Sequence, residues 1–450
     1  MPAEAALAER GEPRIVIVGG GFGGLEAAKV LGKAGLEVTL VDRQNHHLFQ
    51  PLLYQVATAA LSAADIAEPI RKILRRHRNV RVILGEVARV DADKRSLTLT
   101  DGMVLPYDVL ILAPGAAHSY FGHDEWAGFA PGLKTVEDAR AIRSRSLLAF
   151  EHAEKTDDPA EQQRLMTIAV VGGGPTGVEL AGSLAELSRF TLARDFRQVD
   201  PEKARIILLE AGPRLLSGFS EKMSRYAAER LERLGVEVKT GAAVEEIGED
   251  FVRFSGEAVP TGVVVWAAGV AASPLGRTLG VETDRTGRVP VDEKLAVRGL
   301  PDVYAIGDLA RCEDEEGNPL PGLAQVAKQQ GRHLATQLAR HLREGAPMSP
   351  FRYRGRGNTA IVGRHAAIFE QGSFKIKGWL AWLAWAFIHV YLLVGAQHRT
   401  QVSLQWLWRY VTYERGARLL THPDGAPKAG KGPLPQAADE PARRPDRTVR

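Results

Sequence analysis

Cysteine is almost missing from this sequence, since Cys312 is the only one among 450 residues. A disulfide within the chain, a cysteine-pair redox centre and a cysteine-rich zinc cluster are therefore excluded, and we predict no metal site. Enzymes that pass electrons through a dithiol are excluded for the same reason. Cys312 itself is expected to be an inert loop residue.

A strong excess of one charge is also lacking. The chain has 58 Lys and Arg against 54 Asp and Glu, a net charge of +4. This charge is too small to indicate a nucleic-acid partner, and no basic face interleaved with aromatic residues appears. Residues 1–14 contain no apolar core of signal-peptide length, so we expect the protein to stay on the cytoplasmic side of the cell membrane. A length of 450 residues predicts two or three domains.

Long uncharged stretches are rare, and the clearest is GWLAWLAWAFIHVYLLV at 378–394. As a helix it reaches about 25 Å, short of the roughly 30 Å hydrocarbon core of a bilayer. Five of the seven tryptophans lie between 379 and 408, and tryptophan prefers the membrane–water boundary. With the amphipathic stretch at 402–413, this predicts C-terminal helices that lie in a membrane surface. A dimer interface or a core helix would explain the pattern as well.

Two glycine-rich motifs stand out among the residues that are present: GGGFGG at 19–24 and GGGPTG at 172–177. Each follows an apolar run and precedes a helix-like stretch, as the dinucleotide-binding fingerprint requires. Its glycines permit a tight turn, close approach of backbone to a pyrophosphate, and close helix–strand packing. The candidate contacts are Gly19, Gly21, Gly23, Gly24, Gly172, Gly174, Pro175 and Gly177. Two such motifs favour electron transfer between a nicotinamide and a flavin.

An acid ends the second apolar run of each unit. Asp42 follows VTLV at 38–41 and Glu210 follows IILL at 206–209. A carboxylate there can accept both ribose hydroxyls of an adenosine. At Glu210 it would also repel a 2′-phosphate, which favours NADH over NADPH. The alternative is a pair of surface acids that end buried strands.

The order of motifs predicts an α/β protein with two Rossmann-like dinucleotide-binding domains. The first unit has expected strands at 15–18, 38–41, 80–84, 96–99 and 109–112 and a helical region near 66–77; the second repeats this plan. The matching strands end in the small-residue turns Ala113-Pro114-Gly115 and Ala267-Ala268-Gly269, which let backbone approach a nucleotide. The stretch 303–308, ending at Asp308, and a helix at 323–342 should return to the first domain.

We therefore divide the chain into four parts. Residues 14–132 and 300–370 form a discontinuous first dinucleotide-binding domain, and residues 150–285 form an inserted second one. Residues 371–420 hold the membrane-anchoring helices. Residues 421–450 contain six prolines and mixed charge, and are expected to be disordered.

Several longer stretches resemble type II NADH dehydrogenase, the single-subunit NADH:quinone oxidoreductase family. They are the two glycine motifs, DRQNHHLFQPLLYQVA at 42–57, GGGPTGVELAG at 172–182, AIGD at 305–308 and AQVAKQ at 324–329. The last resembles the family's A-Q-x-A-x-Q quinone-site motif. The resemblance covers about residues 14–418. In two places the chain departs from the family: the usual Ala-Thr-Gly turn is Ala113-Pro114-Gly115, and Ala396-Gln397 replaces an aromatic and a basic residue.

The resemblance implies FAD on the first unit and NADH, as substrate, on the second. It adds Gln50, Gly115, Asp308 and Gln325 to the flavin side and Ala268 and Gly269 to the NADH side. Glu179 resembles the family glutamate that faces the nicotinamide, although an acid in a first helical turn is also favourable to the helix dipole. Gln325, Lys328 and Gln329 resemble the quinone site, with a polar helix start as the alternative. Homodimers, a bilayer-surface location and the absence of proton pumping are implied as well.

Two other functions remain open at this point. The chain could reduce a small iron–sulfur protein or another soluble acceptor, although such an acceptor needs no membrane anchor. It could also be a redox-sensing flavoprotein with slow turnover. Rapid multiple-turnover reduction of a quinone would exclude the second.

Overall fold

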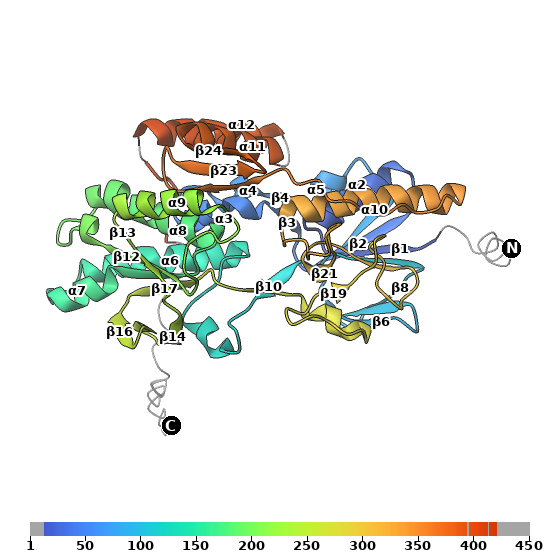
Figure 1. The fold of residues 1–450 in the computed structure, drawn as a ribbon, viewed down its shortest axis with the longest axis horizontal. Coiled ribbons are helices and arrows are strands. Elements are labelled where there is room, and N and C mark those ends of the chain that lie inside the picture. The colour runs from blue at the N-terminus through green and yellow to red at the C-terminus, as the bar shows by residue number, and fades with distance from the viewer. Residues whose placement is uncertain (1–12, 394–395, 413, 421–450) are drawn as a thin grey trace, which may run out of the picture.

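The computed structural model describes residues 13–393, 396–412 and 414–420. Two units lie side by side, and C-terminal residues form a further layer along the upper edge (Figure 1). The tail at 421–450, for which we predict disorder, lies outside the described residues.

A five-stranded parallel sheet carries the first glycine motif, in the order β20-β9-β1-β2-β5. Its strands are β1 (Ile15–Val18), β2 (Val38–Asp42), β5 (Val80–Leu84), β9 (Val109–Leu112) and β20 (Val303–Ala305). Strands β1 and β9 are entirely apolar and fully buried, as expected where both faces of a parallel sheet are covered. Helices α2 (Phe22–Lys33) and α10 (Ala324–Glu344) lie above it. Strand β20 pairs with β9, so the chain returns to this sheet after the second unit.

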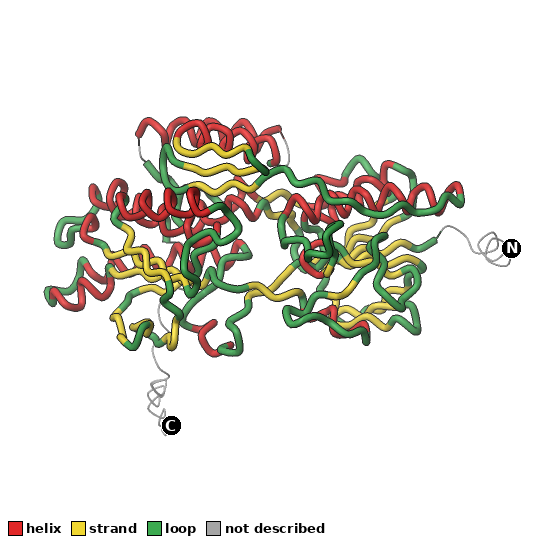
Figure 2. Tube along the Cα trace, viewed as in Figure 1, coloured by secondary structure: helices red, strands yellow, loops and turns green. Residues whose placement is uncertain are grey.

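A four-stranded parallel sheet carries the second motif, in the order β13-β12-β11-β17. Its strands are β11 (Thr167–Val171), β12 (Arg205–Glu210), β13 (Val236–Thr240) and β17 (Val263–Trp266). Helices α6 (Val136–Ala153), α7 (Pro159–Leu165), α8 (Pro175–Glu186) and α9 (Glu221–Arg233) surround it (Figure 2). The two parallel sheets confirm the predicted α/β class.

Each unit also carries a small antiparallel sheet, inserted between two strands of its main sheet. These sheets are β6 (Val87–Asp91), β7 (Ser96–Leu99) and β8 (Val104–Pro106) in the first unit, and β14 (Val244–Ile247), β15 (Phe251–Phe254) and β16 (Glu257–Pro260) in the second. Two antiparallel strands, β10 (Ala116–His118) and β18 (Val270–Ala272), connect the units. Short pairs are β3 (His46–Leu48) with β4 (Ala67–Pro69), and β19 (Val289–Pro290) with β21 (Ala310–Arg311).

The helical region predicted near 66–77 is wrong as a single helix. Helix α4 (Ala63–Ile66) ends where β4 begins, and α5 (Ile70–Leu74) follows. Pro69 disfavours the helical conformation at Glu68, so that residue stays extended and pairs with His47 of β3. Before α4 come the one-turn helix η1 (Gln50–Leu52) and α3 (Leu53–Ala57). Residues of α3 pack into the core of the second unit rather than the first.

The C-terminal layer is a three-stranded antiparallel sheet with two helices. Its elements are β22 (Asn358–Ile361), β23 (Ala367–Gln371), β24 (Phe374–Gly378), α11 (Trp379–Leu392) and α12 (Ala396–Thr412). Strand β23 crosses the predicted domain boundary between 370 and 371. Among the described residues, no helix has the length and apolar character needed to cross a membrane.

Candidate active site

The first glycine loop has the shape that a bound pyrophosphate requires. Gly19 has a φ of +99°, and a Cβ there would lie 2.1 Å from the Ala113 carbonyl oxygen. A Cβ at Gly24 would lie 1.9 Å from the Gly19 oxygen, so only glycine lets α2 pack this closely on β1. A Cβ at Gly21 would meet nothing within 4 Å, because the loop is open at that point. Gly23 packs against Ile306 and the start of α10.

The second glycine loop repeats this geometry. Gly172 has a φ of +111°, and its Cβ would lie 2.6 Å from the carbonyl carbon of Ala267 and from the Cα of Ala268. A Cβ at Gly177 would lie 1.8 Å from the Gly172 oxygen, whereas the space around Gly174 is open. Helix α8 begins at Pro175, so its N-terminus points at this open space.

Gly269 follows the same small-residue turn but contacts the strand connection rather than the loop. Its carbonyl oxygen accepts a hydrogen bond from the Ser119 N–H at 3.1 Å. Gly269 is engaged with this connection, and the nucleotide contacts of Ala268 and Gly269 stay predictions.

The two predicted ribose acids occupy equivalent positions. Asp42 accepts hydrogen bonds from the backbone N–H groups of Gly20 at 2.5 Å and Gln44 at 2.6 Å. Glu210 accepts from those of Gly173 and Gly212, both at 2.6 Å. Burial raises the pKa of Asp42 and is opposed by these backbone donors. A carboxylate has about four acceptor positions, so each acid retains capacity for ribose hydroxyls.

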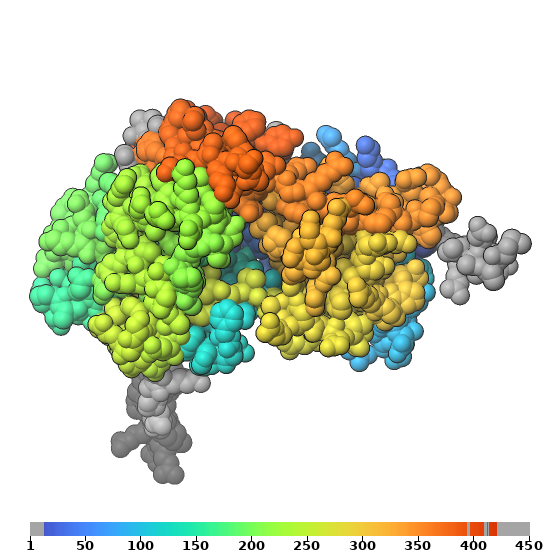
Figure 3. Space-filling view, viewed as in Figure 1, coloured from blue at the N-terminus to red at the C-terminus, as the bar shows by residue number. Residues whose placement is uncertain are grey.

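A cavity of about 190 Å³, here the loop cavity, lies over the first glycine loop. Asp42, Gly115 and Ala327 are among its walls. A second cavity of about 490 Å³, the central cavity, adjoins it and reaches Thr176 and Glu179 of the second unit. Both are lined by Phe22, Gln50, Lys134, Asp308, Leu323 and Ala324. The molecular surface is hollowed between the two units (Figure 3), so the two loops face a shared space.

Glu179 lies one turn into α8, past the predicted first turn, at the wall of the central cavity. Its Oε1 accepts a hydrogen bond from the Ile361 N–H at 3.3 Å. Burial raises the pKa of Glu179 to about 8, so the carboxyl is mostly protonated at neutral pH. A neutral acid beside a cavity can donate or accept a hydrogen bond.

The comparisons with known proteins agree with this geometry. Residues 13–331 match the family described as pyridine nucleotide-disulphide oxidoreductase. The type II NADH:quinone oxidoreductase NdhA of Mycobacterium tuberculosis is 44% identical over 428 residues, covering 91% of this chain and 90% of that protein. The Ndh protein of the same organism is 42% identical over 422 residues, with coverages of 91% and 90%.

The chain belongs to the type II NADH:quinone oxidoreductase family. The solved structure of NDH2 from Plasmodium falciparum in complex with NADH has the same fold, with a TM-score of 0.84 at 21% identity, covering 90% of this chain and 99% of that one. The disulphide chemistry in the broader family's description does not apply here, because Cys312 has no cysteine partner in the sequence. It is buried and its thiol pKa is raised by that burial.

The predicted quinone residues of this type II enzyme, Gln325, Lys328 and Gln329, lie on α10 beside the cavities, whereas Ala324 and Ala327 of the same motif line them. The Gln325 Nε2 donates to the Gly357 carbonyl at 3.1 Å, while its buried Oε1 has no partner among the described residues. Gln329 exchanges two hydrogen bonds with the Arg354 backbone, at 3.0 and 3.1 Å. Lys328 is half-buried. The central cavity is lined instead by Val326 and Gln330, so the quinone role of Gln325, Lys328 and Gln329 stays a prediction.

The motif at 42–57 contains a residue that our sequence analysis did not single out. The buried His47 packs edge-on against Phe22, and its Nδ1 lies 3.0 Å from the Gly20 carbonyl oxygen. Burial lowers the pKa of His47 to about 4. The ring is therefore neutral. It donates a hydrogen bond to the Gly20 carbonyl oxygen, which helps to hold the first glycine loop in place.

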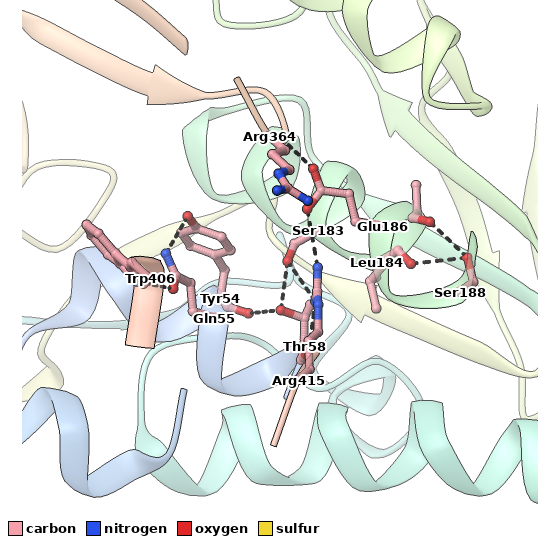
Figure 4. Close-up of polar contacts among 11 residues, drawn as sticks. Tyr54, Gln55, Thr58, Ser183, Leu184, Glu186, Ser188, Arg364, Trp406 and Arg415 are labelled. Atoms are coloured by element: carbon pink, nitrogen blue, oxygen red, sulfur yellow. Dashed lines mark hydrogen bonds and ion pairs between the residues drawn. The ribbon is translucent and has the colours of Figure 1, made fainter. Parts of the chain in front are cut away.

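A buried polar cluster joins the C-terminal segment to both units (Figure 4). The Arg415 guanidinium donates to the Thr58 carbonyl at 2.8 Å and to the Ser183 hydroxyl at 3.2 Å, and it pairs with Glu186 at 3.3 Å. Glu186 also accepts from the Arg364 backbone N–H at 2.5 Å. Sequence analysis missed this cluster because its members are separated by up to 357 residues.

A third cavity of about 100 Å³, the C-terminal cavity, adjoins this cluster. Tyr54 and Glu179 line both it and the central cavity, and Trp382 and Trp385 close it on the side of α11. The Trp406 indole donates to the Gln55 Oε1 at 3.0 Å. The C-terminal helices therefore contribute directly to the surroundings of Glu179.

Proposed function

We propose that this protein is a non-proton-pumping NADH:quinone oxidoreductase. Bound FAD would supply the redox chemistry between a hydride from NADH and the electrons delivered to the quinone. The observation that carries this proposal is the shared space that joins the first glycine loop to Glu179. Hydride transfer needs the reacting atoms about 3–3.5 Å apart, so the protein's main contribution is to position two dinucleotides against each other.

The first unit has the features that FAD needs. The open space at Gly21 admits a pyrophosphate, and Asp42 has acceptor capacity for the adenosine ribose. Further along the same cavities lie Gln50, whose Nε2 donates to the Lys134 carbonyl at 3.3 Å, and Asp308. These residues would bind and orient the flavin in the FAD-binding domain that we propose for residues 14–132 and 300–370.

The second unit, residues 150–285 in our division, would hold NADH. The pyrophosphate would lie over Gly174 at the N-terminus of α8, and Glu210 would bind the adenosine ribose. We propose that Glu179 faces the nicotinamide, because it lies one helical turn beyond this N-terminus and lines the central cavity. Glu179→Gln should slow flavin reduction by NADH, or weaken NADH binding, while FAD stays bound.

The C-terminal helices support a membrane quinone over a soluble acceptor. Large apolar side chains are exposed on them: Trp379, Leu380, Leu383, Phe387, Tyr391 and Leu392 on α11, and Leu404, Leu407 and Trp408 on α12. We call these residues the apolar surface. Apolar exposure of this extent marks an interaction site, and tryptophan favours the membrane boundary. We propose that the apolar surface lies in the bilayer surface, and a homodimer on the cytoplasmic face remains our prediction.

Separate half-reactions test the proposed function. The purified protein should show a flavin absorption spectrum that NADH bleaches under nitrogen and that a quinone restores over many turnovers. NADPH should bleach it less efficiently. Bleaching without rapid restoration by quinone would favour a redox-sensing flavoprotein. Restoration by a soluble iron–sulfur protein, with no preference for long-chain quinones, would favour the soluble-acceptor reductase.

A further inference from the structure

A run of exposed cations lies in the first unit, outside the site described above. Between Glu68 and Glu86 the sequence has no carboxylate. Its exposed basic residues are Arg71, Lys72, Arg75, Arg76, Arg78 and Arg81, which we call the basic surface. Lys72 pairs with Glu68 at 2.6 Å; none of the five arginines has an ion-pair partner among residues 13–393, 396–412 and 414–420.

Buried neighbours and backbone hydrogen bonds hold these basic side chains at the surface. Ile70 and Leu74 of α5 are 0% and 2% exposed, so this short helix turns its basic side chains to solvent. The Asn79 Nδ2 then donates to the carbonyl oxygens of Gly32 at 3.0 Å and Leu36 at 2.7 Å. The turn that carries Arg76 and Arg78 is thereby fastened to the end of α2.

The basic surface begins where α12 contacts the first unit. Glu68 Oε2 lies 2.8 Å from the Nε2 of His398 on α12, while its Oε1 pairs with Lys72. The Nε2 groups of Gln401 and Gln405 donate to Asp65 at 3.0 and 3.3 Å. Helix α5 also lies on the same upper edge of the molecule as α11 and α12 (Figure 1). The basic surface is therefore continuous with the helices that carry the apolar surface.

We propose that the basic surface binds the phosphate headgroups of anionic lipids. This proposal rests on the membrane contact of the apolar surface proposed above and extends it to a second element. A polybasic segment at an anionic bilayer gains about fivefold in affinity per basic residue. Stable membrane attachment commonly combines an apolar anchor with a basic patch of this kind. Residues 70–86 contain no Phe, Tyr or Trp, the aromatic side chains typical of a base-stacking platform.

The experiment compares two triple variants of the full-length protein with equal loss of charge. The first is Arg75→Gln, Arg76→Gln, Arg78→Gln. The control is Arg277→Gln, Arg285→Gln, Arg298→Gln, three exposed arginines in the 270–300 segment, which lies on the lower edge (yellow in Figure 3). Co-sedimentation is measured with phosphatidylcholine vesicles, with and without phosphatidylglycerol, at low and high salt.

We expect the first variant to bind phosphatidylglycerol-containing vesicles about ten- to a hundredfold more weakly than wild type, with the difference lost at high salt. The control should bind like wild type, and all three should bind pure phosphatidylcholine equally through the apolar surface. Equal binding of the first variant and wild type to anionic vesicles would overturn the proposal. Loss of wild-type binding to both vesicle types would contradict the apolar contact instead.

Discussion

Asp42 and Glu210 each place both carboxylate oxygens on backbone N–H groups of the loop beside which a nucleotide would bind. The acids therefore have two roles, since they hold the loop and leave acceptor capacity for a ribose. The arrangement is the same in the two units, so the two sites serve as controls for each other.

Glu210→Gln should lower the ratio of kcat/KM for NADH over NADPH by roughly ten- to a hundredfold. Hydrogen bonds to a charged acceptor are worth about 1.5–3 kcal/mol, and the neutral amide no longer repels a 2′-phosphate. Asp42→Asn makes the equivalent change in the first unit, and it should weaken FAD retention without altering this ratio. Steady-state kinetics and the flavin content after gel filtration give the two readouts. An unchanged ratio in Glu210→Gln would make Glu210 a bystander.

The pKa of Glu179 predicts a pH dependence of stability. Its folded-state pKa is raised from an ordinary 4.5 to about 8 by burial. Its contribution is therefore fully present below about pH 4.5 and is lost as the pH rises through about 8, because only the unfolded chain ionises freely in that interval. The Tm of the wild type should fall more between pH 5 and pH 8 than that of Glu179→Gln, which cannot ionise. Parallel Tm profiles for the two proteins would contradict a raised pKa at this position.

Whole elements were predictable where the sequence pattern is local. The apolar runs of β1, β9, β11 and β17 and the glycine that follows β1 or β11 determine the strand–loop–helix geometry over a few residues. The region 66–77 was not predictable in this way. Strand β4 pairs with β3 and interrupts a stretch whose sequence indicates one helical region. The cluster around Arg415 was not predictable either, because its contacts with Thr58 and Ser183 span 357 and 232 residues.

Helix α11 shows the same limit, since a helix that is apolar all round does not reveal which side is buried. The structure divides it: Ala381, Trp385 and His389 face the protein, whereas Leu380 and Phe387 are 64% and 74% exposed. One side of α11 is therefore a core helix, and the other side is exposed, as the prediction of a membrane-surface helix requires.

Substitutions on the two sides of α11 should have different consequences. Leu380→Glu with Phe387→Glu should reduce vesicle binding and reaction with long-chain quinones, because charge on the apolar surface opposes burial in lipid. NADH oxidation with ferricyanide should remain. Trp385→Ala should instead lower the free energy of unfolding by about 3–5 kcal/mol, the usual cost of truncating a buried large aromatic. Thermal melting and vesicle co-sedimentation separate the two, and the apolar surface is not a membrane contact if the double variant still co-sediments fully.

At the scale of the molecule, a quinone from the membrane would have to reach a flavin in the shared space between the units, and two routes lead there. One route follows the start of α10, where Ala324 and Val326 line the central cavity and the Gln325 Oε1 is buried without a partner among the described residues. The other route passes Trp382 in the C-terminal cavity, which shares Tyr54 and Glu179 with the central one.

Half-reactions distinguish these routes because the proposed NADH site in the second unit is the same in both cases. We expect Gln325→Ala and Gln329→Ala to leave flavin bleaching by NADH nearly intact and to slow its reoxidation by quinone, since amide donors stabilise the charge that develops on a quinone oxygen. Gln329→Ala also removes two hydrogen bonds to Arg354, so its Tm is measured alongside to separate a loosened 354–357 loop from a lost quinone contact. Trp382→Ala is the matched variant on the other route. Trp382→Ala alone could slow reoxidation, with both glutamine variants matching wild type at every quinone concentration. That result would mean that the quinone reaches the flavin through the C-terminal helices. The motif at 324–329 would then serve to hold the 354–357 loop.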